Sequence, residues 1–125
     1  MRVLVIDDSR AARMAIGRIL KGIGFEIDEA ENGEVALSHL KNQGPYELCM
    51  IDWNMPVMNG YEFIKQVRKD SRFSSVTLVM VTTENEMSQV VKALSAGANE
   101  YVMKPFTEEI ILEKLEILGL GPTNG

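Results

Sequence analysis

Acidic residues follow two of the apolar segments of the chain. Asp7 and Asp8 come directly after the run Arg2–Ile6, and Asp52 follows Leu48–Ile51. If these segments are neighbouring parallel strands, the three carboxylates meet at one edge of a sheet. A pair about 5 Å apart then repels by roughly 3 kcal/mol at an effective dielectric constant near 20. Such a cluster requires either raised carboxyl pKa values or a bound cation, and Mg²⁺ fits best because it takes carboxylates, waters and a phosphate as ligands.

Two further apolar segments also end in polar side chains. Val76–Val81 leads into Thr82 and Thr83, and Tyr101–Met103 leads into Lys104. Taken singly, each polar residue has an ordinary explanation, because Asp or Thr after a strand commonly caps a helix and Lys is commonly a solvated charge. Their occurrence at successive strand ends favours one shared site.

The elements that position these residues are predicted by hydrophobic periodicity. Short β-branched segments alternate with amphipathic segments, in which apolar residues recur every three or four positions. Five strand–helix units in a row predict an α/β fold with a parallel sheet, right-handed crossovers and helices on both faces. The predicted strands are Arg2–Ile6, Phe25–Ala30, Leu48–Ile51, Val76–Val81 and Tyr101–Met103, and the helical patterns include Ser9–Ile23, Gly60–Arg68, Asn85–Ala96 and Thr107–Leu118.

Helix termini are indicated by capping residues. Side chains that accept hydrogen bonds are expected at N-caps, and left-handed glycines at C-caps. The predicted N-caps are Ser9, Asn59 and Thr107, the pairs with capping-box spacing are Asn59 with Glu62 and Thr83 with Glu86, and the predicted C-cap glycines are Gly44, Gly97 and Gly119.

Core positions follow from the same periodicity. Cys49 and three methionines are interpreted as packed side chains, His39 as a solvated residue, and Leu112 and Ile117 as either scattered surface apolars or part of a binding patch. The expected inward sets are Ala12, Ile16, Ile19, Leu20 and Ile23; Phe63, Ile64 and Val67; Met87, Val90, Val91 and Leu94; Ile111, Leu115 and Leu118; and the methionines are Met14, Met80 and Met103.

Length, composition and charge exclude several classes of function. The 125 residues suit one domain, expected over residues 1–120 with a loose tail at 121–125. The net charge of −5 repels nucleic acid and anionic membranes, so neither is expected as a partner. One cysteine and one histidine exclude an internal disulfide and a multi-histidine metal site. Without a signal peptide or an apolar run of membrane-spanning length, a cytoplasmic location is expected. The protein is also expected to be a monomer.

The order and spacing of the polar residues resemble the receiver domain of two-component response regulators over essentially the whole chain. The segment Asp-Trp-Asn-Met-Pro at 52–56, with Glu84 and Tyr101, is most similar to the stand-alone chemotaxis regulators of that family. The resemblance implies a flavodoxin-like (βα)5 fold with strand order 2-1-3-4-5. The matching segments are Asp7-Asp8, Asp52–Gly60, Thr82 and Tyr101–Phe106.

The resemblance also implies the chemistry. Asp52 would accept a phosphoryl group from the phosphohistidine of a histidine kinase. Asp8, Asp52 and the main-chain carbonyl of Asn54 would hold Mg²⁺, with Asp7 acting directly or through water. Such a protein is a signalling switch that assists its own phosphorylation and dephosphorylation, and is not an enzyme with a separate substrate.

The remaining residues would transmit and time the signal. Thr82 and Lys104 would contact the phosphoryl oxygens, with a cis peptide bond before Pro105 directing the lysine. Tyr101 would change rotamer as Thr82 moves, and a downstream protein would bind the face formed by the fourth helix, the fifth strand and the fifth helix.

Three residues are expected to set the lifetime of the aspartyl phosphate. Asn54 and Glu84 flank the path of the attacking water, and Thr83, where the family usually has Ala or Gly, narrows access. Other functions remain open at this point: a phosphate sink or phosphorelay receiver, a receiver that only docks, a flavodoxin-like electron carrier, or a haloacid-dehalogenase-like phosphatase. The pair Asp7-Asp8 would repel a flavin phosphate, and 125 residues leave little room for a phosphatase cap.

Overall fold

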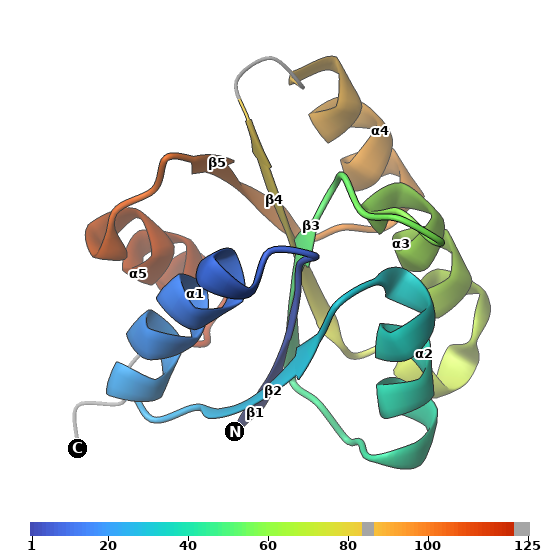
Figure 1. The fold of residues 1–125 in the computed structure, drawn as a ribbon, viewed down its shortest axis with the longest axis horizontal. Helices are drawn as coiled ribbons and strands as arrows, with labels where there is room; N and C mark the ends of the chain where they lie inside the picture. Colours follow the sequence, from blue (N-terminus) through green and yellow to red (C-terminus); the bar gives the residue numbers. More distant parts are fainter. Residues whose placement is uncertain (84–86, 122–125) are drawn as a thin grey trace.

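A single parallel sheet, with helices on both faces, forms the frame of the molecule (Figure 1). The computed structural model describes residues 1–83 and 87–121, with the backbone alone at residue 87. The strand order β2-β1-β3-β4-β5 confirms the predicted fold. The strands are β1 (Arg2–Ile6), β2 (Glu26–Ala30), β3 (Leu48–Asp52), β4 (Thr77–Thr83) and β5 (Glu100–Lys104), and the helices are α1 (Arg10–Gly22), α2 (Gly33–Asn42), α3 (Gly60–Lys69), α4 (Met87–Ala96) and α5 (Glu108–Ile117), with a short 3₁₀ turn at Ser71–Phe73.

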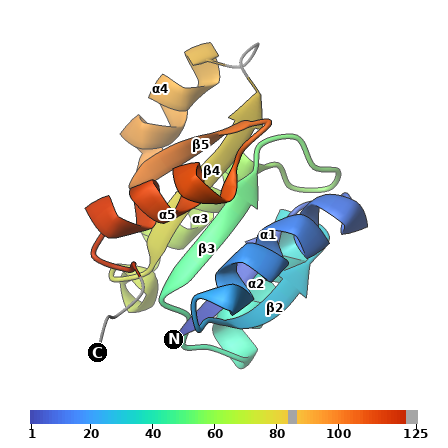
Figure 2. The ribbon, with the colours of Figure 1, turned by 90° about the vertical axis from the view of Figure 1, so that its left-hand side faces the viewer.

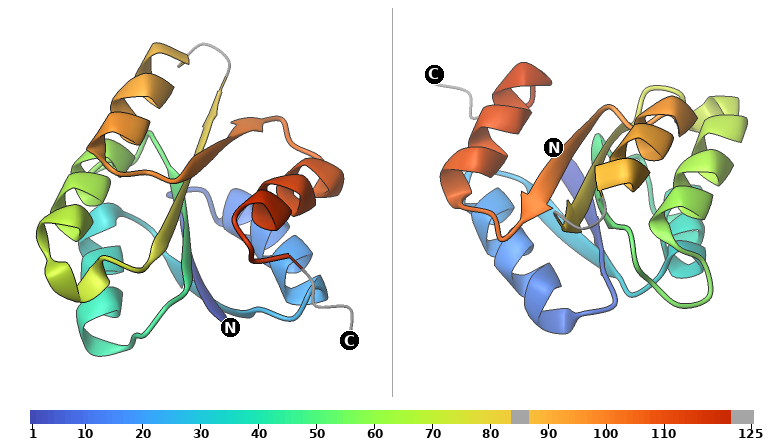
Figure 3. Two further views of the ribbon diagram at one scale, coloured as in Figure 1. Left: turned by 180° about the vertical axis from the view of Figure 1, so that it is seen from behind. Right: turned by 90° about the horizontal axis from the view of Figure 1, so that it is seen from above.

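The helices cover the two faces of the sheet unequally. Helices α1 and α5 lie on one face and α2, α3 and α4 on the other. Helices α1 and α5 lie in front of the strands in Figure 2, and the two groups flank the strands in the left view of Figure 3. Residues of β1, β3 and β4 alternate between the two resulting cores. In β1, for example, Leu4 and Ile6 face α2 and α3, whereas Val3 and Val5 face α1 and α5. Each such buried aliphatic side chain contributes about 1.5–3 kcal/mol to folding, which fixes the register of the strands.

Most predicted helix ends are confirmed. The side chains of Ser9, Asn59 and Thr107 accept backbone N–H groups of α1, α3 and α5, and Asn59 forms a complete capping box with Glu62. Glu86, the proposed partner of Thr83, lies outside the described residues. The N-cap of α2 was not predicted from the sequence: the side chain of Asn32 accepts the N–H of Val35.

The predicted C-cap glycines differ from one another. Gly97 and Gly119 have positive φ values of 125° and 76°, as expected at helix ends. The prediction for Gly44 is wrong, because Gly44 follows the C-cap residue Gln43 but is not among the glycines with a positive φ value; it precedes Pro45. A following proline ring disfavours helical geometry in the residue before it, so this position belongs to the connection to β3.

The inward stripe of α4 is also different from the prediction. Val90 is buried as expected, but its neighbour in the core is Ala93, and Val91 and Leu94 are 64% and 41% exposed. The small side chain of Ala93 lets the helix lie close to the sheet, which a leucine at that position would prevent. The side chain of Met87 lies outside the described part of the chain.

Several single-residue expectations can be checked in the same way. Cys49 and Met80 are buried as predicted, whereas Met103 is only half-buried. The prediction for Met14 is wrong, because it is 49% exposed on α1. The fully solvated environment expected for His39 is also wrong: the residue is half-buried, and its Nδ1 is buried without a hydrogen-bond partner among the described residues. Leu112 is half-buried and Ile117 is exposed. None of the described helices combines the length and apolar character needed to cross a bilayer.

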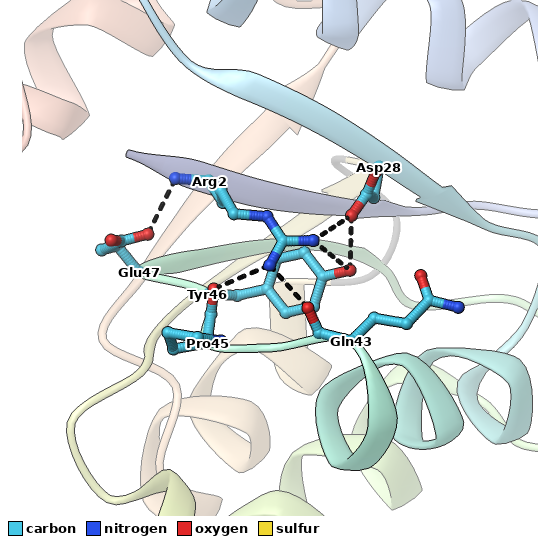
Figure 4. A network of polar contacts seen from close by, with 6 residues as sticks. All are labelled: Arg2, Asp28, Gln43, Pro45, Tyr46 and Glu47. Carbon is cyan, nitrogen blue, oxygen red and sulfur yellow. Dashed lines mark hydrogen bonds and ion pairs between the residues drawn. The ribbon is translucent and has the colours of Figure 1, made fainter.

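A polar network ties β1, β2 and the α2–β3 connection together at the end of the sheet where the strands begin (Figure 4). The guanidinium of Arg2 donates to Asp28 Oδ2 at 2.8 Å and to the carbonyl of Gln43, and it lies 4.6 Å from the centre of the Tyr46 ring. The Tyr46 hydroxyl donates to the same Asp28 oxygen at 2.6 Å. This hydrogen bond from Tyr46 is the main reason that the pKa of Asp28 is lowered from its ordinary value of 3.8, with the Arg2 contacts adding to it.

The network predicts acid-sensitive stability. Since the pKa of Asp28 is lower in the folded than in the unfolded state, its stabilisation is present above pH 3.8 and is lost as the pH falls through the folded value. Tyr46→Phe removes the hydrogen bond to Asp28 and should lower the free energy of unfolding at pH 7. The expected loss is only about 1 kcal/mol, because the Asp28 side chain is partly exposed to solvent. Urea unfolding of wild type and variant from pH 7 to pH 3 measures this difference, which should shrink toward the acid end. Tyr61→Phe, outside the network, is the control, and an equal loss in both variants would contradict the assignment.

Candidate functional site

Three carboxylates meet at the edge of the sheet where the strands end. One oxygen from each of Asp7, Asp8 and Asp52 lies within 4.8 Å of the others. The parallel register explains the meeting, because Ile6 of β1 pairs with Ile51 of β3 and an aspartate follows each of them. Asp7 and Asp52 are buried, whereas Asp8 is exposed. The structure therefore brings together the acidic residues that the sequence placed at the ends of neighbouring strands.

Lys104 places a positive charge against this cluster. Its Nζ lies 3.2 Å from Asp7 Oδ2 and 3.2 Å from Asp52 Oδ1, so one ammonium group contacts two carboxylates. Lys104 is the last residue of β5, and the expected cis peptide bond to Pro105 is present. One ammonium does not neutralise three carboxylates, so the site retains an excess of negative charge that can attract a cation.

The negative charge and burial of the cluster change the pKa of Asp52. Burial, followed by repulsion from Asp7, raises this pKa from 3.8 to about 6, although the contacts with Lys104 oppose the rise. Burial alone would lower the pKa of Lys104, but attraction by Asp52 and Asp7 raises it overall. The Asp52 carboxylate is thus a charged group held in an environment that disfavours its charge, and a nearby cation would relieve that cost.

The two threonines after the fourth apolar run lie at the same edge of the sheet. Thr82 is buried and pairs with Met103 of β5, while Thr83 is exposed and pairs with Lys104. Asp52 pairs with Val81, which places Thr82 one residue beyond the level of the acidic group. The register therefore brings Thr82 and Lys104 to the edge that carries the carboxylates.

Asn54 and Tyr101 are two other predicted residues that the structure describes. Asn54 is exposed in the segment between β3 and α3. Tyr101 is half-buried on β5, where the Lys114 ammonium lies 4.6 Å from the centre of its ring. Glu84 lies outside the described residues, so its expected position at the site is not described.

Backbone contacts hold the segment after Asp52 close to the strand. The Gly60 N–H donates to the Trp53 carbonyl at 3.0 Å. A Cβ at Gly60 would lie 2.5 Å from the Asp52 carbonyl oxygen, so only glycine fits this approach. Trp53 is buried, and its ring centre lies 5.6 Å from that of Tyr61. The acidic group is therefore supported by packed residues on the α3 side of the sheet.

One residue at the site was missed by the sequence analysis. Arg13 of α1 donates from Nη1 to the main-chain carbonyl of Asp7 at 2.6 Å and from Nε to Glu29 at 2.8 Å. The periodicity of Ser9–Ile23 places Arg13 outside the inward set of that helix and assigns it no role. A signal for this contact was present in the sequence. Arg13 lies about one helical turn after the N-cap Ser9, so its side chain can reach back to the segment that contains Asp7 and Asp8.

Comparison with known proteins gives a consistent result. Residues 3–116 match the sequence profile of the response regulator receiver domain. Chemotaxis protein CheY1 of Helicobacter pylori is 43% identical over 119 residues, which cover 94% of this chain and 96% of that protein. The chemotaxis protein CheY homolog of Campylobacter jejuni is 41% identical over 127 residues, covering 100% and 98%. The high-resolution structure of chemotaxis response regulator CheY4 of Vibrio cholerae matches with a TM-score of 0.86 at 32% identity, over 94% of this chain and 97% of that one.

The raised pKa of Asp52 predicts a stabilising substitution in the absence of metal. Because the folded value of about 6 exceeds the unfolded value near 3.8, wild type loses stability as the pH rises across this window. Asp52→Asn removes the buried charge, while Lys104 keeps its contact with Asp7. In buffer with excess chelator, the variant should melt several degrees higher than wild type at pH 7.5, and the difference should close as the pH falls to 4.

Thermal melts followed by circular dichroism test this expectation. Asp70→Asn is the matched control, because the hydrogen bond and ion pair with Arg72 lower the pKa of Asp70 to about 2. Removing that carboxylate should not raise the melting temperature. A lower melting temperature for Asp52→Asn than for wild type at pH 7.5 would show that the Asp52 charge is not under electrostatic strain.

Proposed function

This chain belongs to the response regulator receiver domain family, and from that membership we propose that it is a phosphorylation-driven switch with Asp52 as the phosphoacceptor. The observation that carries the proposal is the setting of the Asp52 carboxylate. It ends β3 with the Lys104 ammonium 3.2 Å away and with oxygens of Asp7 and Asp8 within 4.8 Å. Since the relatives from Helicobacter pylori and Campylobacter jejuni are chemotaxis proteins matched over nearly their whole length, we assign the switch to chemotaxis-type signalling.

The proposed reaction transfers a phosphoryl group from a histidine kinase. A carboxylate oxygen of Asp52 attacks the phosphorus of the kinase phosphohistidine, the new P–O bond forms as the P–N bond breaks, and the histidine nitrogen takes up a proton. Catalysis of such a step consists mainly of positioning and of neutralising charge on the phosphoryl oxygens. Lys104 supplies a positive charge at this place, and Thr82 supplies a hydroxyl group at the same edge of the sheet.

The acidic cluster would hold Mg²⁺. Asp8, Asp52 and the main-chain carbonyl of Asn54 are the proposed ligands, with Asp7 binding directly or through water. The donor set fits this ion, since three carboxylates offer hard oxygen ligands within 4.8 Å of one another. Mg²⁺, when bound, supplies positive charge that neutralises the carboxylates and the transferred phosphoryl group.

The signal would leave the molecule through the face formed by α4, β5 and α5. Tyr101 lies on this face between the helices and would change rotamer as Thr82 moves toward the phosphate. Exposed apolar side chains support the assignment, because Val91 and Leu94 on α4 and Ile117 on α5 are available to a partner protein. The downstream partner is thus proposed to be a protein that buries aliphatic side chains against this face.

Two exposed residues are proposed to set the lifetime of the aspartyl phosphate. Asn54 lies in the segment after the acceptor, and Thr83 pairs with Lys104 at the edge of the site. Both side chains are open to solvent, where they can position or obstruct the water that hydrolyses the acyl phosphate. The same role is proposed for Glu84.

Phosphorylation from a small-molecule donor tests the acceptor. With phosphoramidate and Mg²⁺, wild type should gain the mass of one phosphoryl group in intact-protein mass spectrometry, and Asp52→Asn should gain none. Asp70→Asn, which removes a distant carboxylate, should behave as wild type. Full phosphorylation of Asp52→Asn at another residue would refute the assignment of the acceptor, and undiminished uptake in excess chelator would refute the role of the metal.

The output face is tested by substituting its exposed aliphatic residues. The double variant Val91→Ser with Leu94→Ser should fold and accept phosphate normally, because both side chains are exposed. In cells of the source organism, it should fail to restore chemotactic spreading in soft agar, as should Asp52→Asn. Met14→Ser on α1, which also replaces an exposed apolar side chain, is the control and should restore spreading. If the double variant restores spreading and Asp52→Asn does not, the protein acts as a phosphate sink, and no partner binds it through α4.

A further inference from the structure

Asp7 is bonded at each of its polar groups. Its N–H donates to the Ala30 carbonyl at 3.1 Å, and its Oδ1 accepts the Ser9 N–H at 2.9 Å. Its Oδ2 lies 3.2 Å from Lys104 Nζ, and its carbonyl accepts Arg13 Nη1 at 2.6 Å. The partners come from the end of β2, the start of α1 and the end of β5. Asp7 is therefore fixed in orientation by three separate elements of the fold.

Arg13 makes one of these bonds to Asp7 and a second bond to β2. Its guanidinium bonds the Asp7 carbonyl with one nitrogen and Glu29 of β2 with another, and its side chain is only 15% exposed. Arg10 and Arg18, on the same helix, are exposed. A planar guanidinium can hold two acceptors in a fixed relative direction, which a single ammonium group cannot do. Arg13 thus differs from its neighbours in linking α1, β2 and the acidic segment.

The Asp7 carbonyl belongs to the peptide group that leads into Asp8. A bond to this carbonyl restrains the ψ angle of Asp7, and a change in that angle alone turns the whole of Asp8, side chain included, about the Cα–C bond of Asp7. Asp8 is exposed, so packing does not fix its direction. We propose that Arg13 is a positioning residue of the magnesium site, which holds the Asp7–Asp8 peptide in the orientation that directs the Asp8 carboxylate toward Asp52. This inference rests on the proposed function.

The positioning role and the charge of Arg13 predict opposite effects on metal binding. By charge alone, removal of a cation near three carboxylates strengthens the binding of Mg²⁺. By positioning, its removal frees the peptide and weakens binding, because groups that orient metal ligands typically contribute 10- to 100-fold to affinity. The charge of Arg13 is also offset by Glu29 at 2.8 Å, which reduces its effect on the cluster. We therefore expect positioning to dominate.

Magnesium titrations of Arg13→Met and Arg10→Met separate the two effects. Both variants lose one positive charge from α1, and of the two arginines it is Arg13 that, in the described part of the chain, bonds the Asp7 carbonyl. Followed by the fluorescence of Trp53 and by calorimetry at one pH, Arg13→Met should bind Mg²⁺ about tenfold more weakly than wild type. Arg10→Met should bind it equally or more tightly. Unchanged or tighter binding by Arg13→Met would overturn the proposal.

A second pair of variants guards against a purely structural explanation. Arg13→Lys keeps the charge but not the two-pronged contact, and should show an intermediate loss of affinity even if Arg13→Met does not fold. Glu29→Gln retains an acceptor for Arg13 and removes only the offsetting charge, so it should weaken Mg²⁺ binding much less than Arg13→Met does. Lower thermal stability of the Arg13 variants in chelator, combined with wild-type affinity for Mg²⁺, would also refute the positioning role.

The dependence of phosphorylation on magnesium distinguishes this inference from the function it rests on. With phosphoramidate as donor, Arg13→Met should need about tenfold more Mg²⁺ for half-maximal rate, and saturating Mg²⁺ should restore a rate near that of wild type. If wild type itself neither binds Mg²⁺ nor takes up phosphate, the proposed function fails. If wild type does both and Arg13→Met has the same half-saturation point, the proposed function stands and the role of Arg13 fails.

Discussion

The mutual repulsion of three carboxylates is the constraint on which the site depends. Parallel pairing of β1 and β3 carries Asp7 and Asp52 to the same edge of the sheet, and burial then strengthens the repulsion between them. The fold tolerates this arrangement because β5 brings Lys104 against both residues and because the bonds of Asp7 hold it in place. The energy stored at this edge is what makes the site responsive to a cation or to a change in the charge of Asp52.

The rest of the molecule supplies the stability that this edge lacks. At the other end of the strands, Arg2, Asp28 and Tyr46 join two strands and a loop through satisfied hydrogen bonds. Near the end of α3, the half-buried guanidinium of Arg68 donates to the carbonyls of Val76 and Gly97, linking α3, the start of β4 and the end of α4. Two cores, one on each face of the sheet, pack between these networks. The strained group is thus carried by a frame in which the polar groups of these two networks are paired.

Local patterns in the sequence predicted the fold and the acidic group, whereas contacts between distant segments were beyond them. Strand alternation, N-caps and the residues at strand ends depend on neighbours along the chain, and the register of parallel strands then places Asp7, Asp8 and Asp52 together. The bond from Arg13 to a backbone carbonyl depends on how α1 lies over β2, which periodicity does not specify. The hydrogen bond between Asp28 and Tyr46 is a contact of the same kind, across 18 positions.

The two aliphatic stripes of α4 have a consequence for the rotational setting of that helix. Val90 and Ala93 face the core, and Val91 and Leu94, displaced by about 100° around the helix axis, face outward. Both stripes are apolar, so hydrophobicity alone does not decide which of them is buried, and the small size of Ala93 decides by fit. A rotation of α4 by one residue about its axis would bury Val91 and Leu94 in place of Val90 and Ala93, at little cost in solvation free energy. The helix is therefore held in its present rotation by the fit of Ala93 in the core and not by a difference in polarity between the two stripes.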